Sequence, residues 1–326
     1  MTAVFQAAGY DVVGLDTFYF AECTLEPDYI KVAEIRKDIR DVTVADLEGI
    51  DVICHMAALS NDPLGDLDAS LTYDINHSAS TKLAILAKQA GVSRFLYASS
   101  CSMYGASSAN EILTEESPLN PLTPYAISKI RTEDDLRKLA DDHFSPVYMR
   151  NATVYGVSPR LRADIVLNNL TAWAYTTGKI RIMSDGTPWR PLVHVRDVCA
   201  AFVAVAGAKR DAIHNQAFNV GQNNENYQVR DLAEIVRQTV PNCTVEYGKE
   251  SVSDPRNYRV DFSKIKQIVD TFKPEWNAQR GAAELYKAYM AAGLTFDDFQ
   301  GRRYVRLKQI KHLLDTELLN ADLRWN

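Results

Sequence analysis

Short apolar runs alternate with stretches of helical spacing through much of the chain. The runs predict strands at residues 10–15, 52–55, 95–98, 147–150 and 217–220. Between and after them, apolar positions recur with a helical period and predict helices at residues 78–90, 125–142, 198–207 and 229–240. Strands that are apolar on both faces are typical of parallel sheets covered by helices. The alternation therefore predicts an α/β protein with a doubly wound parallel sheet.

Residues that commonly begin or end helices predict some of these boundaries. Thr123 is a good helix N-cap and Pro124 suits the first helical position, so a helix is expected to begin there. Gly91 is expected to end the helix before it. From Phe296 to Leu314, apolar residues again follow a helical period, which indicates packing across the protein or against a partner subunit.

Composition narrows the class of protein. The chain has 326 residues, 46% of them hydrophobic, and a formal net charge of −6 with both signs dispersed, so a nucleic-acid partner is not expected. No apolar run is long enough for a membrane span and no signal peptide is evident. Five scattered cysteines without a C-x-x-C pair, and dispersed histidines, predict reduced thiols, no metal site and a cytoplasmic location.

Tyr125 and Lys129 are the first candidates for chemistry. A spacing of four puts both side chains on one helix face, one turn apart. A free tyrosine has a pKa of about 10, and a nearby ammonium lowers it by favouring the phenolate. The pair could then move a proton on a hydroxyl. Alone the pattern is weak, because such pairs occur by chance in many helices.

The surrounding motifs resemble the extended short-chain dehydrogenase/reductase family of NAD-dependent nucleotide-sugar epimerases and dehydratases. Residues 97–105 resemble its S-S-x-x-x-Y-G segment, and Tyr125 follows Ser100 at close to the family's interval. Further ordered matches are the His55-Met56-Ala57-Ala58 turn, residues 150–156 (RNATVYG), residues 190–198 (RPLVHVRDV) and residues 218–221 (FNVG). The resemblance covers about residues 4–275 and implies a Rossmann-type fold.

The resemblance also implies roles for individual residues. Ser100, Tyr125 and Lys129 would be catalytic. The cofactor NAD would be bound by Tyr125 and Lys129 and by Asp16, Asp38, Ile39, Met56, Ala57, Ala58, Asn76 and Ser99. The substrate, a nucleotide-diphosphate sugar, would be bound by Ser102, Thr153, Asn169, Leu170, Arg190 and Arg256. Asp16 favours NAD over NADP, because a carboxylate repels the 2′-phosphate.

The resemblance further implies two domains and a homodimer. The NAD-binding domain would comprise residues 1–156 and about 192–226. The sugar-binding domain would comprise about 157–191 and 227–326, including a helical extension. The dimer would form through the helices that contain Ser78 and Tyr125.

One departure concerns the cofactor. The printed sequence contains no G-x-G-x-x-G or G-x-x-G-x-x-G, and residues 1–9 resemble the latter part of the helix that follows such a loop. The expectation is an N-terminally truncated member that lacks the first strand and the glycine-rich loop, with weak or absent NAD binding. A start site assigned too late and a natural loss remain alternatives.

A second departure concerns the reaction. Dehydratases of the family carry an Asp-Glu pair directly after the catalytic serine or threonine, and here Cys101 and Ser102 stand there. Thr153 stands where many members of the family have a substrate-side asparagine, so the sequence does not identify the sugar. The sequence therefore predicts an NAD-dependent epimerase acting through a transient 4-keto intermediate. Alternatives are a 4-ketoreductase or dehydratase, or a non-catalytic binding protein that reuses the fold.

Overall fold

The computed structural model describes residues 1–25, 32–60, 68–106, 111–247 and 256–326. Its helices and short helical turns are α1 (Thr2–Ala7), η1 (Ile39–Asp41), η2 (Val44–Leu47), α3 (Ala69–Tyr73), η3 (Asp74–Ser78), α4 (Ala79–Gln89), η4 (Cys101–Tyr104), α5 (Pro124–Leu139), α6 (Val166–Thr177), α7 (Val195–Gly207), α8 (Arg210–Ile213), η5 (Asn223–Glu225), α9 (Val229–Thr239), α10 (Ser263–Ile268), α11 (Ala278–Ala291), α12 (Phe296–Gln300) and α13 (Arg306–Asp315).

Its strands are β1 (Val13–Asp16), β2 (Ala33–Arg36), β3 (Val52–His55), β4 (Arg94–Ser100), β5 (Ile112–Leu113), β6 (Ser145–Asn151), β7 (Thr153–Tyr155), β8 (Lys179–Ile182), β9 (Trp189–His194), β10 (Ala217–Val220), β11 (Asn226–Gln228), β12 (Thr244–Tyr247) and β13 (Arg259–Val260).

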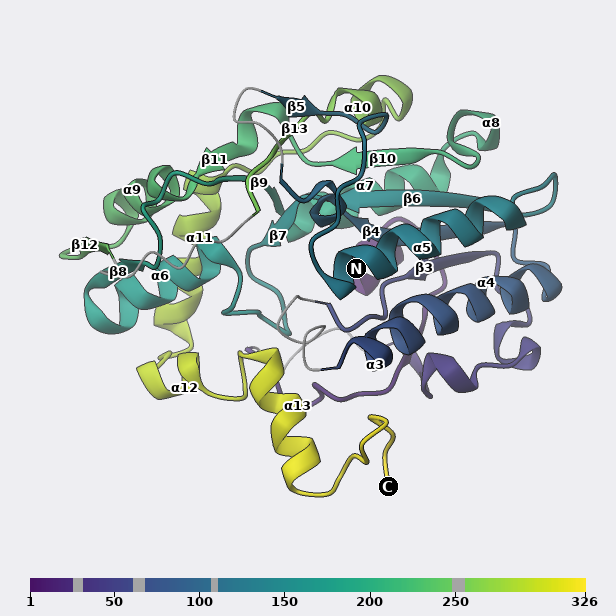
Figure 1. Ribbon diagram of the computed structural model, residues 1–326, viewed down its shortest axis with the longest axis horizontal. Coiled ribbons are helices and arrows are strands. Elements are labelled where there is room, and N and C mark those ends of the chain that lie inside the picture. The colour runs from purple at the N-terminus through teal and green to yellow at the C-terminus, as the bar shows by residue number, and fades with distance from the viewer. Residues whose placement is uncertain (26–31, 61–67, 107–110, 248–255) are drawn as a thin grey trace.

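A parallel sheet in the order β10-β6-β4-β3 forms the centre of the fold. Alternate residues of β4 point to opposite faces: Phe95 packs in a cluster with residues of α4 and α5, and Leu96 packs in one with residues of α7. Figure 1 shows α4 and α5 running along the same face of this sheet. The expected doubly wound α/β architecture is confirmed.

The strands β1 and β2 form a separate two-stranded parallel sheet. Among the described strands, β1 is paired with β2 alone and β3 with β4 alone, so β1 and β3 belong to different sheets. The side chain of Val13 on β1 is 47% exposed.

A second region is built around α6, α9 and α11, which contact one another and share one apolar cluster. Beside them β12 pairs with β8 in parallel, and β9 pairs with both β7 and β11. The helix α13 packs against the first part of the chain, because its residues Ile310 and Leu313 share an apolar cluster with Tyr19 and Ile39.

Three predicted boundaries were wrong for identifiable reasons. β1 begins at Val13 because Tyr10 still donates its N–H to the Phe5 carbonyl at the end of α1. α5 ends at Leu139, since Asp141 accepts from the backbone of the turn that follows. α7 begins at Val195, because the side chain of His194 caps it.

Candidate active site

The carboxyl ends of β4 and β6 meet at the beginning of α5. Ser100 is the last residue of β4, and its register partner Asn151 is the last of β6. The Thr123 hydroxyl accepts the Ala126 N–H at 3.2 Å and Pro124 occupies the first turn, as predicted. Ligands of open parallel sheets bind at this edge, beyond the carboxyl ends of the strands.

Tyr125 and Lys129 lie one turn apart on α5, and the Lys129 ammonium nitrogen is 5.6 Å from the Tyr125 ring centroid. The same nitrogen donates to the Ala98 carbonyl of β4 at 2.7 Å and lies 4.7 Å from the Tyr97 ring centroid. Lys129 is buried, while Tyr125 is only partly so. The lysine is thus fixed to the sheet behind a tyrosine that solvent and ligands can reach.

Burial lowers the pKa of Lys129 to about 7, and the negative charge of Glu133 acts in the opposite direction. A nearby ring, His55, has its pKa lowered to about 3 by burial and by the Lys129 charge, so it is neutral at physiological pH. Lys129 is therefore balanced between its charged and neutral forms near neutral pH, as suits a group that tunes a proton transfer.

Glu133 stands one turn beyond Lys129 and anchors the network below the site. Its carboxylate accepts from the Ser99 hydroxyl at 2.6 Å and from two nitrogens of Arg150 at 3.1 and 2.7 Å. All three residues are buried. The network ties α5, β4 and β6 together directly beside Ser100. Sequence reasoning missed Glu133, although Tyr125, Lys129 and Glu133 form an unbroken spacing of four on one helix face.

Two buried side-chain oxygens at this edge, those of Ser102 and Asn151, lack a hydrogen-bond partner. The Ser100 hydroxyl accepts the Ser102 N–H at 3.1 Å, so it caps the turn η4. The Ser102 hydroxyl and the Asn151 side-chain oxygen are both buried without a hydrogen bond. Buried polar atoms are normally paired, so two orphans beside Ser100 favour a polar ligand at this position.

The predicted adenosine-side residues lie at the carboxyl ends of β1 and β2. Asp16 ends β1 with an exposed side chain that accepts the Phe18 N–H at 2.6 Å. Asp38 caps η1, and its carboxylate is bonded to Arg40. Burial tends to raise the pKa of Asp38, but its bonds to Arg40 outweigh this and lower it. Ile39 is buried in an apolar cluster.

The turn after β3 holds the next group of predicted cofactor residues. Met56 is exposed, and Ala57 and Ala58 are half-buried. Asn76 is buried, and its amide both accepts from the Leu59 N–H at 2.7 Å and donates to the Leu59 carbonyl at 3.1 Å. In this structure Asn76 braces the turn that ends at Leu59.

The predicted substrate residues come from several elements. Thr153 is half-buried on β7 and Asn169 donates to the Ala163 carbonyl at 2.9 Å. The Leu170 side chain packs in the core of the second region, so only its backbone is available to a ligand. Arg190 is buried and donates to the Arg256 carbonyl, so the structure brings these two predicted phosphate-side residues together.

These residues fit NAD at its two ends. The orphaned atoms, Lys129 and the Ala98 carbonyl suit a polar nicotinamide-ribose end, and the exposed carboxylate of Asp16 suits the hydroxyls of an adenosine ribose. Between them, the printed sequence supplies no glycine-rich turn for the diphosphate.

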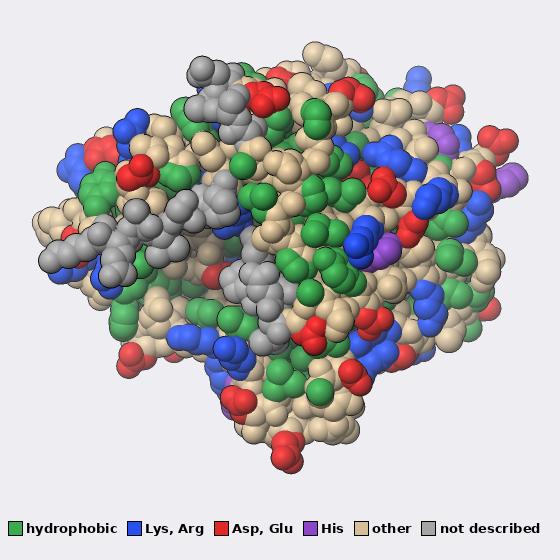
Figure 2. All heavy atoms as spheres, in the orientation of Figure 1, with side chains coloured by type: hydrophobic (Ala, Val, Ile, Leu, Met, Phe, Trp, Pro, Cys, Tyr) green, Lys and Arg blue, Asp and Glu red, His purple; other side chains and the backbone are tan. Residues whose placement is uncertain are grey.

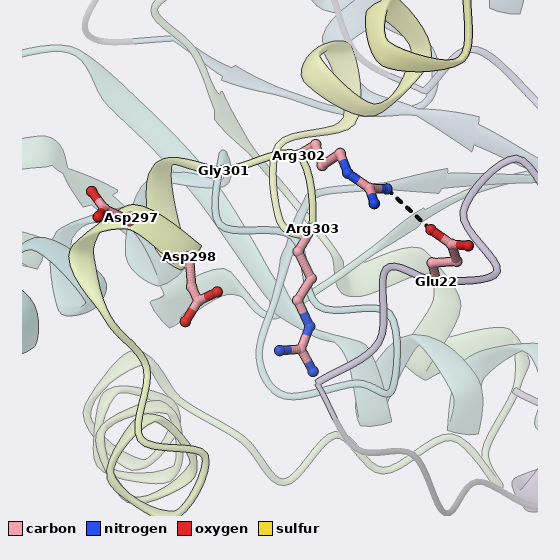
Figure 3. Close-up of a pocket in the computed structure, with 6 residues that line it drawn as sticks. All are labelled: Glu22, Asp297, Asp298, Gly301, Arg302 and Arg303. Atoms are coloured by element: carbon pink, nitrogen blue, oxygen red, sulfur yellow. Dashed lines mark hydrogen bonds and ion pairs between the residues drawn. The ribbon is translucent and has the colours of Figure 1, made fainter. Parts of the chain in front are cut away.

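Other features of the described residues do not point to a second chemistry. A pocket of about 360 Å³ is lined by Glu22, Asp297, Asp298, Gly301, Arg302 and Arg303, and no predicted site residue lines it. Figure 3 shows the charged side chains around it. On the face in Figure 2, acidic and basic side chains are mixed. Within the described ranges, no histidine, cysteine or carboxylate cluster could hold a metal ion, and no helix could cross a bilayer.

Comparisons with known proteins identify relatives of this chain. A model of the NAD dependent epimerase/dehydratase family matches residues 1–221. The UDP-glucose 4-epimerase of Mycolicibacterium smegmatis is 29% identical over 302 residues, which cover 85% of this chain and 89% of that one. The dTDP-D-glucose 4,6-dehydratase of Mus musculus is 29% identical over 240 residues, 71% of this chain and 66% of that one.

Solved structures give the same grouping. MoeE5 in complex with UDP-glucuronic acid and NAD is 25% identical and superimposes with a TM-score of 0.77, covering 89% of this chain and 94% of that chain. TunA, an NAD-dependent NDP-hexosamine 5,6-dehydratase, has a TM-score of 0.78 at 22% identity over 91% of this chain and 94% of that one, which supports the fold alone.

Proposed function

Since the chain belongs to the NAD-dependent epimerase/dehydratase family, we propose that it inverts a nucleotide-diphosphate sugar at C4 through a transient 4-keto intermediate. The observation that carries the proposal is that Lys129, 5.6 Å from the Tyr125 ring on α5, donates to the Ala98 carbonyl of β4, the strand that ends at Ser100. The relatives named for UDP-glucose and UDP-glucuronic acid make these two sugars the first substrates to test.

The proposed mechanism assigns a role to each side chain. The Tyr125 oxygen takes the proton of the sugar 4-hydroxyl, and the Lys129 ammonium behind it stabilises the phenolate. The Ser100 hydroxyl donates a hydrogen bond to the sugar oxygen as it becomes a carbonyl. Bound NAD supplies the hydride acceptor at C4 and the source of its return. The keto sugar must turn in the site, after which Tyr125 gives the proton back to the inverted oxygen.

The positions after Ser100 favour an epimerase over a dehydratase. Loss of water from C5 and C6 needs an acid and a base. Cys101 is buried, its thiol donates to the Arg150 carbonyl at 3.2 Å, and burial raises its pKa far above neutrality. The nearby carboxylate of Glu115 already accepts the Asn219 N–H at 2.7 Å. A 4-keto-6-deoxy product would contradict this choice and favour the dehydratase.

Tyr125→Phe tests the proposal. The variant loses the proton acceptor but keeps the ring, so turnover of the sugar should fall by about a thousandfold or more while the sugar nucleotide still binds. Tyr247→Phe removes an exposed hydroxyl on β12 and serves as the control. Retained turnover in Tyr125→Phe would refute the assignment.

We further propose a homodimer and a cytoplasmic location. Ile85 on α4 is 40% exposed, which supports a helical interface that includes α4 and α5. All five cysteines are free, as expected in a reducing compartment. Sedimentation of the wild type and of Ile85→Glu tests the dimer, since the variant should be monomeric.

A further inference from the structure

Residues 319–325, which we call the clasp, form an ordered turn. Leu319 and Trp325 form an antiparallel bridge at its two ends. The Asn320 side chain accepts the N–H groups of Asp322 and Arg324, each at 3.0 Å. Leu319 and Leu323 are almost fully buried. The turn therefore has a defined shape and an apolar underside.

The clasp is bonded to residues far away in the sequence. Arg40 donates to the carbonyls of Asp322 and Leu323 at 2.9 and 3.2 Å, and the Tyr19 hydroxyl also donates to the Leu323 carbonyl. The Trp325 indole N–H donates to the Thr17 carbonyl at 2.7 Å. Thr17 follows Asp16 at the end of β1, so the clasp sits on the adenosine side of the predicted dinucleotide site.

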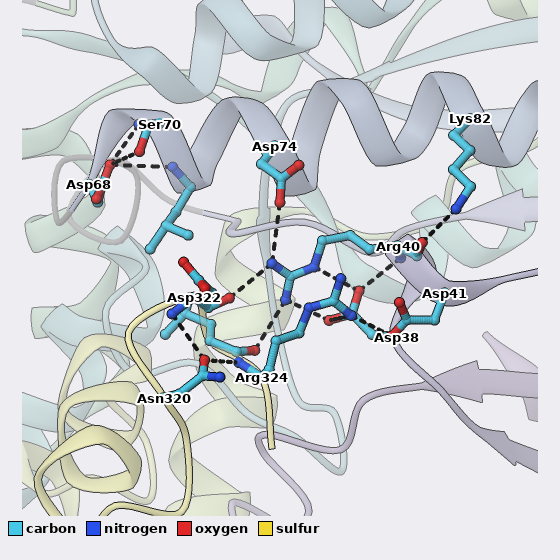
Figure 4. Close-up of polar contacts among 12 residues, drawn as sticks. Asp38, Arg40, Asp41, Asp68, Ser70, Asp74, Lys82, Asn320, Asp322 and Arg324 are labelled. Carbon is cyan, nitrogen blue, oxygen red and sulfur yellow. Dashed lines mark hydrogen bonds and ion pairs between the residues drawn. The ribbon is translucent and has the colours of Figure 1, made fainter. Parts of the chain in front are cut away.

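Asp38 is enclosed by two arginines, Arg40 and the clasp residue Arg324. One carboxylate oxygen accepts the Arg40 N–H and Nε at 2.8 and 3.0 Å. The other accepts Arg40 Nη2 at 2.7 Å and lies 3.6 Å from a guanidinium nitrogen of Arg324, which also pairs with Asp41. Figure 4 shows the guanidinium groups of Arg40 and Arg324 converging on Asp38. The side chain expected to face adenine is thus enclosed, with 12% exposure.

The apolar underside of the clasp covers the neighbouring residues. Leu319 and Leu323 share one buried cluster with Ile39 and Leu59, joined by residues of α13. Ile39 is the second predicted adenine contact, and Leu59 follows the predicted cofactor turn after β3. Ile39 and Leu59, on the adenosine side of the predicted site, therefore belong to the same apolar cluster as the clasp residues Leu319 and Leu323.

We propose that the clasp closes the adenosine end of the dinucleotide site, so that an adenosine ligand binds only after the clasp has moved. This inference rests on the proposed function. The two residues that hold the outer side of the clasp, Arg324 and Trp325, allow such a movement, because they remain 32% and 39% exposed and make surface contacts. A ligand that needs a minor open state binds more weakly by the fraction of molecules that are open.

The test is the affinity of the full chain for ADP-ribose, measured by titration calorimetry. Arg324→Ala combined with Trp325→Ala removes the outer anchors but leaves Leu319 and Leu323 in place. Opening the clasp should tighten ADP-ribose binding by roughly tenfold, or produce binding where the wild type shows none. Lys311→Ala removes one cation from the exposed side of α13 and should leave the affinity unchanged. Unchanged or weaker ADP-ribose binding in the double variant would overturn the proposal.

Two further measurements keep the outcome unambiguous. Trp325→Phe keeps a ring beside Tyr19 but loses the N–H donated to Thr17, so it should give a smaller gain even if the double variant folds poorly. Nicotinamide mononucleotide lacks adenosine and should bind wild type and variants equally. Its failure to bind any of them would count against the proposed function, whereas the affinity for ADP-ribose alone tests the clasp.

Discussion

Lys129 is buried, and burial disfavours the charged form of its amine. Its pKa of about 7 lies below the value of about 10.4 for an unfolded lysine, so between these pH values the unfolded chain binds more protons than the folded one. The destabilisation by Lys129 is thus fully present below pH 7 and is relieved as the pH rises toward 10. Such a cost is typical of residues kept for chemistry.

Lys129→Met should remove this dependence. The free energy of unfolding of the variant minus that of the wild type should be largest at about pH 6 and should decline toward about pH 9. Chemical denaturation at several pH values measures it. Lys138→Met, on the exposed side of α5, is the control and should give a constant difference over this range. A flat difference for Lys129→Met would mean that the lysine is not held near neutrality.

Glu133 provides a contrast between a buried and an exposed ion pair. Glu133→Gln leaves the Arg150 guanidinium buried without its counter-charge and should cost about 3 kcal/mol of unfolding free energy. Arg137→Ala breaks a pair to the same carboxylate from a side chain that is 38% exposed and should cost less than about 1 kcal/mol. Equal losses in denaturant titrations would show that Glu133 does not hold the network.

At the scale of elements, the division between β1 and β3 affects local stability. Among the strands that the structure describes, β4 and β6 have partners on both sides, whereas β1 and β2 pair only with each other. A two-stranded sheet is weak by itself, and here the clasp and its cluster join it to the rest of the fold.

Hydrogen exchange should reveal this difference. Amides of β4 and β6 should exchange slowest, and those of β1 and β2 should exchange faster by at least about tenfold, since they open without global unfolding. Arg324→Ala with Trp325→Ala should increase the rates in β1 and leave those in β4 unchanged. Equal protection of β1 and β4 in the wild type would contradict the described sheet order.

The elements also show how far the sequence could be read. β3 and β10 lie where their apolar runs predicted, and α5 begins at the predicted Thr123-Pro124 cap, because these signals are local. The pairing of β8 with β12 joins segments far apart in the sequence and carried no local signal. The hydrogen bond from Arg40 to the Leu323 carbonyl also carried no local signal, although the same guanidinium group binds Asp38. The predicted site residues were readable from motifs, but Glu133 and the clasp depend on tertiary packing.

For the whole molecule, the motifs of these 326 residues lead to a prediction about the cofactor. A polypeptide that consists of these 326 residues alone should purify without stoichiometric NAD, because they contain no G-x-G-x-x-G or G-x-x-G-x-x-G turn whose backbone N–H groups would hold the diphosphate. Extraction and quantification of bound nucleotide from the purified chain measures this. One NAD per chain would show that other residues hold the diphosphate.

Inversion of a sugar at C4 by Tyr125, Lys129 and Ser100 is the activity on which the proposed function depends. The most direct measurement is the product formed from UDP-glucose or UDP-glucuronic acid by the full chain, with NAD at a concentration shown to saturate it. We expect the C4 epimer, unchanged in mass, from the wild type and none from Tyr125→Phe. A product lighter by one water, or the same epimer formed by Tyr125→Phe, would contradict the proposed function.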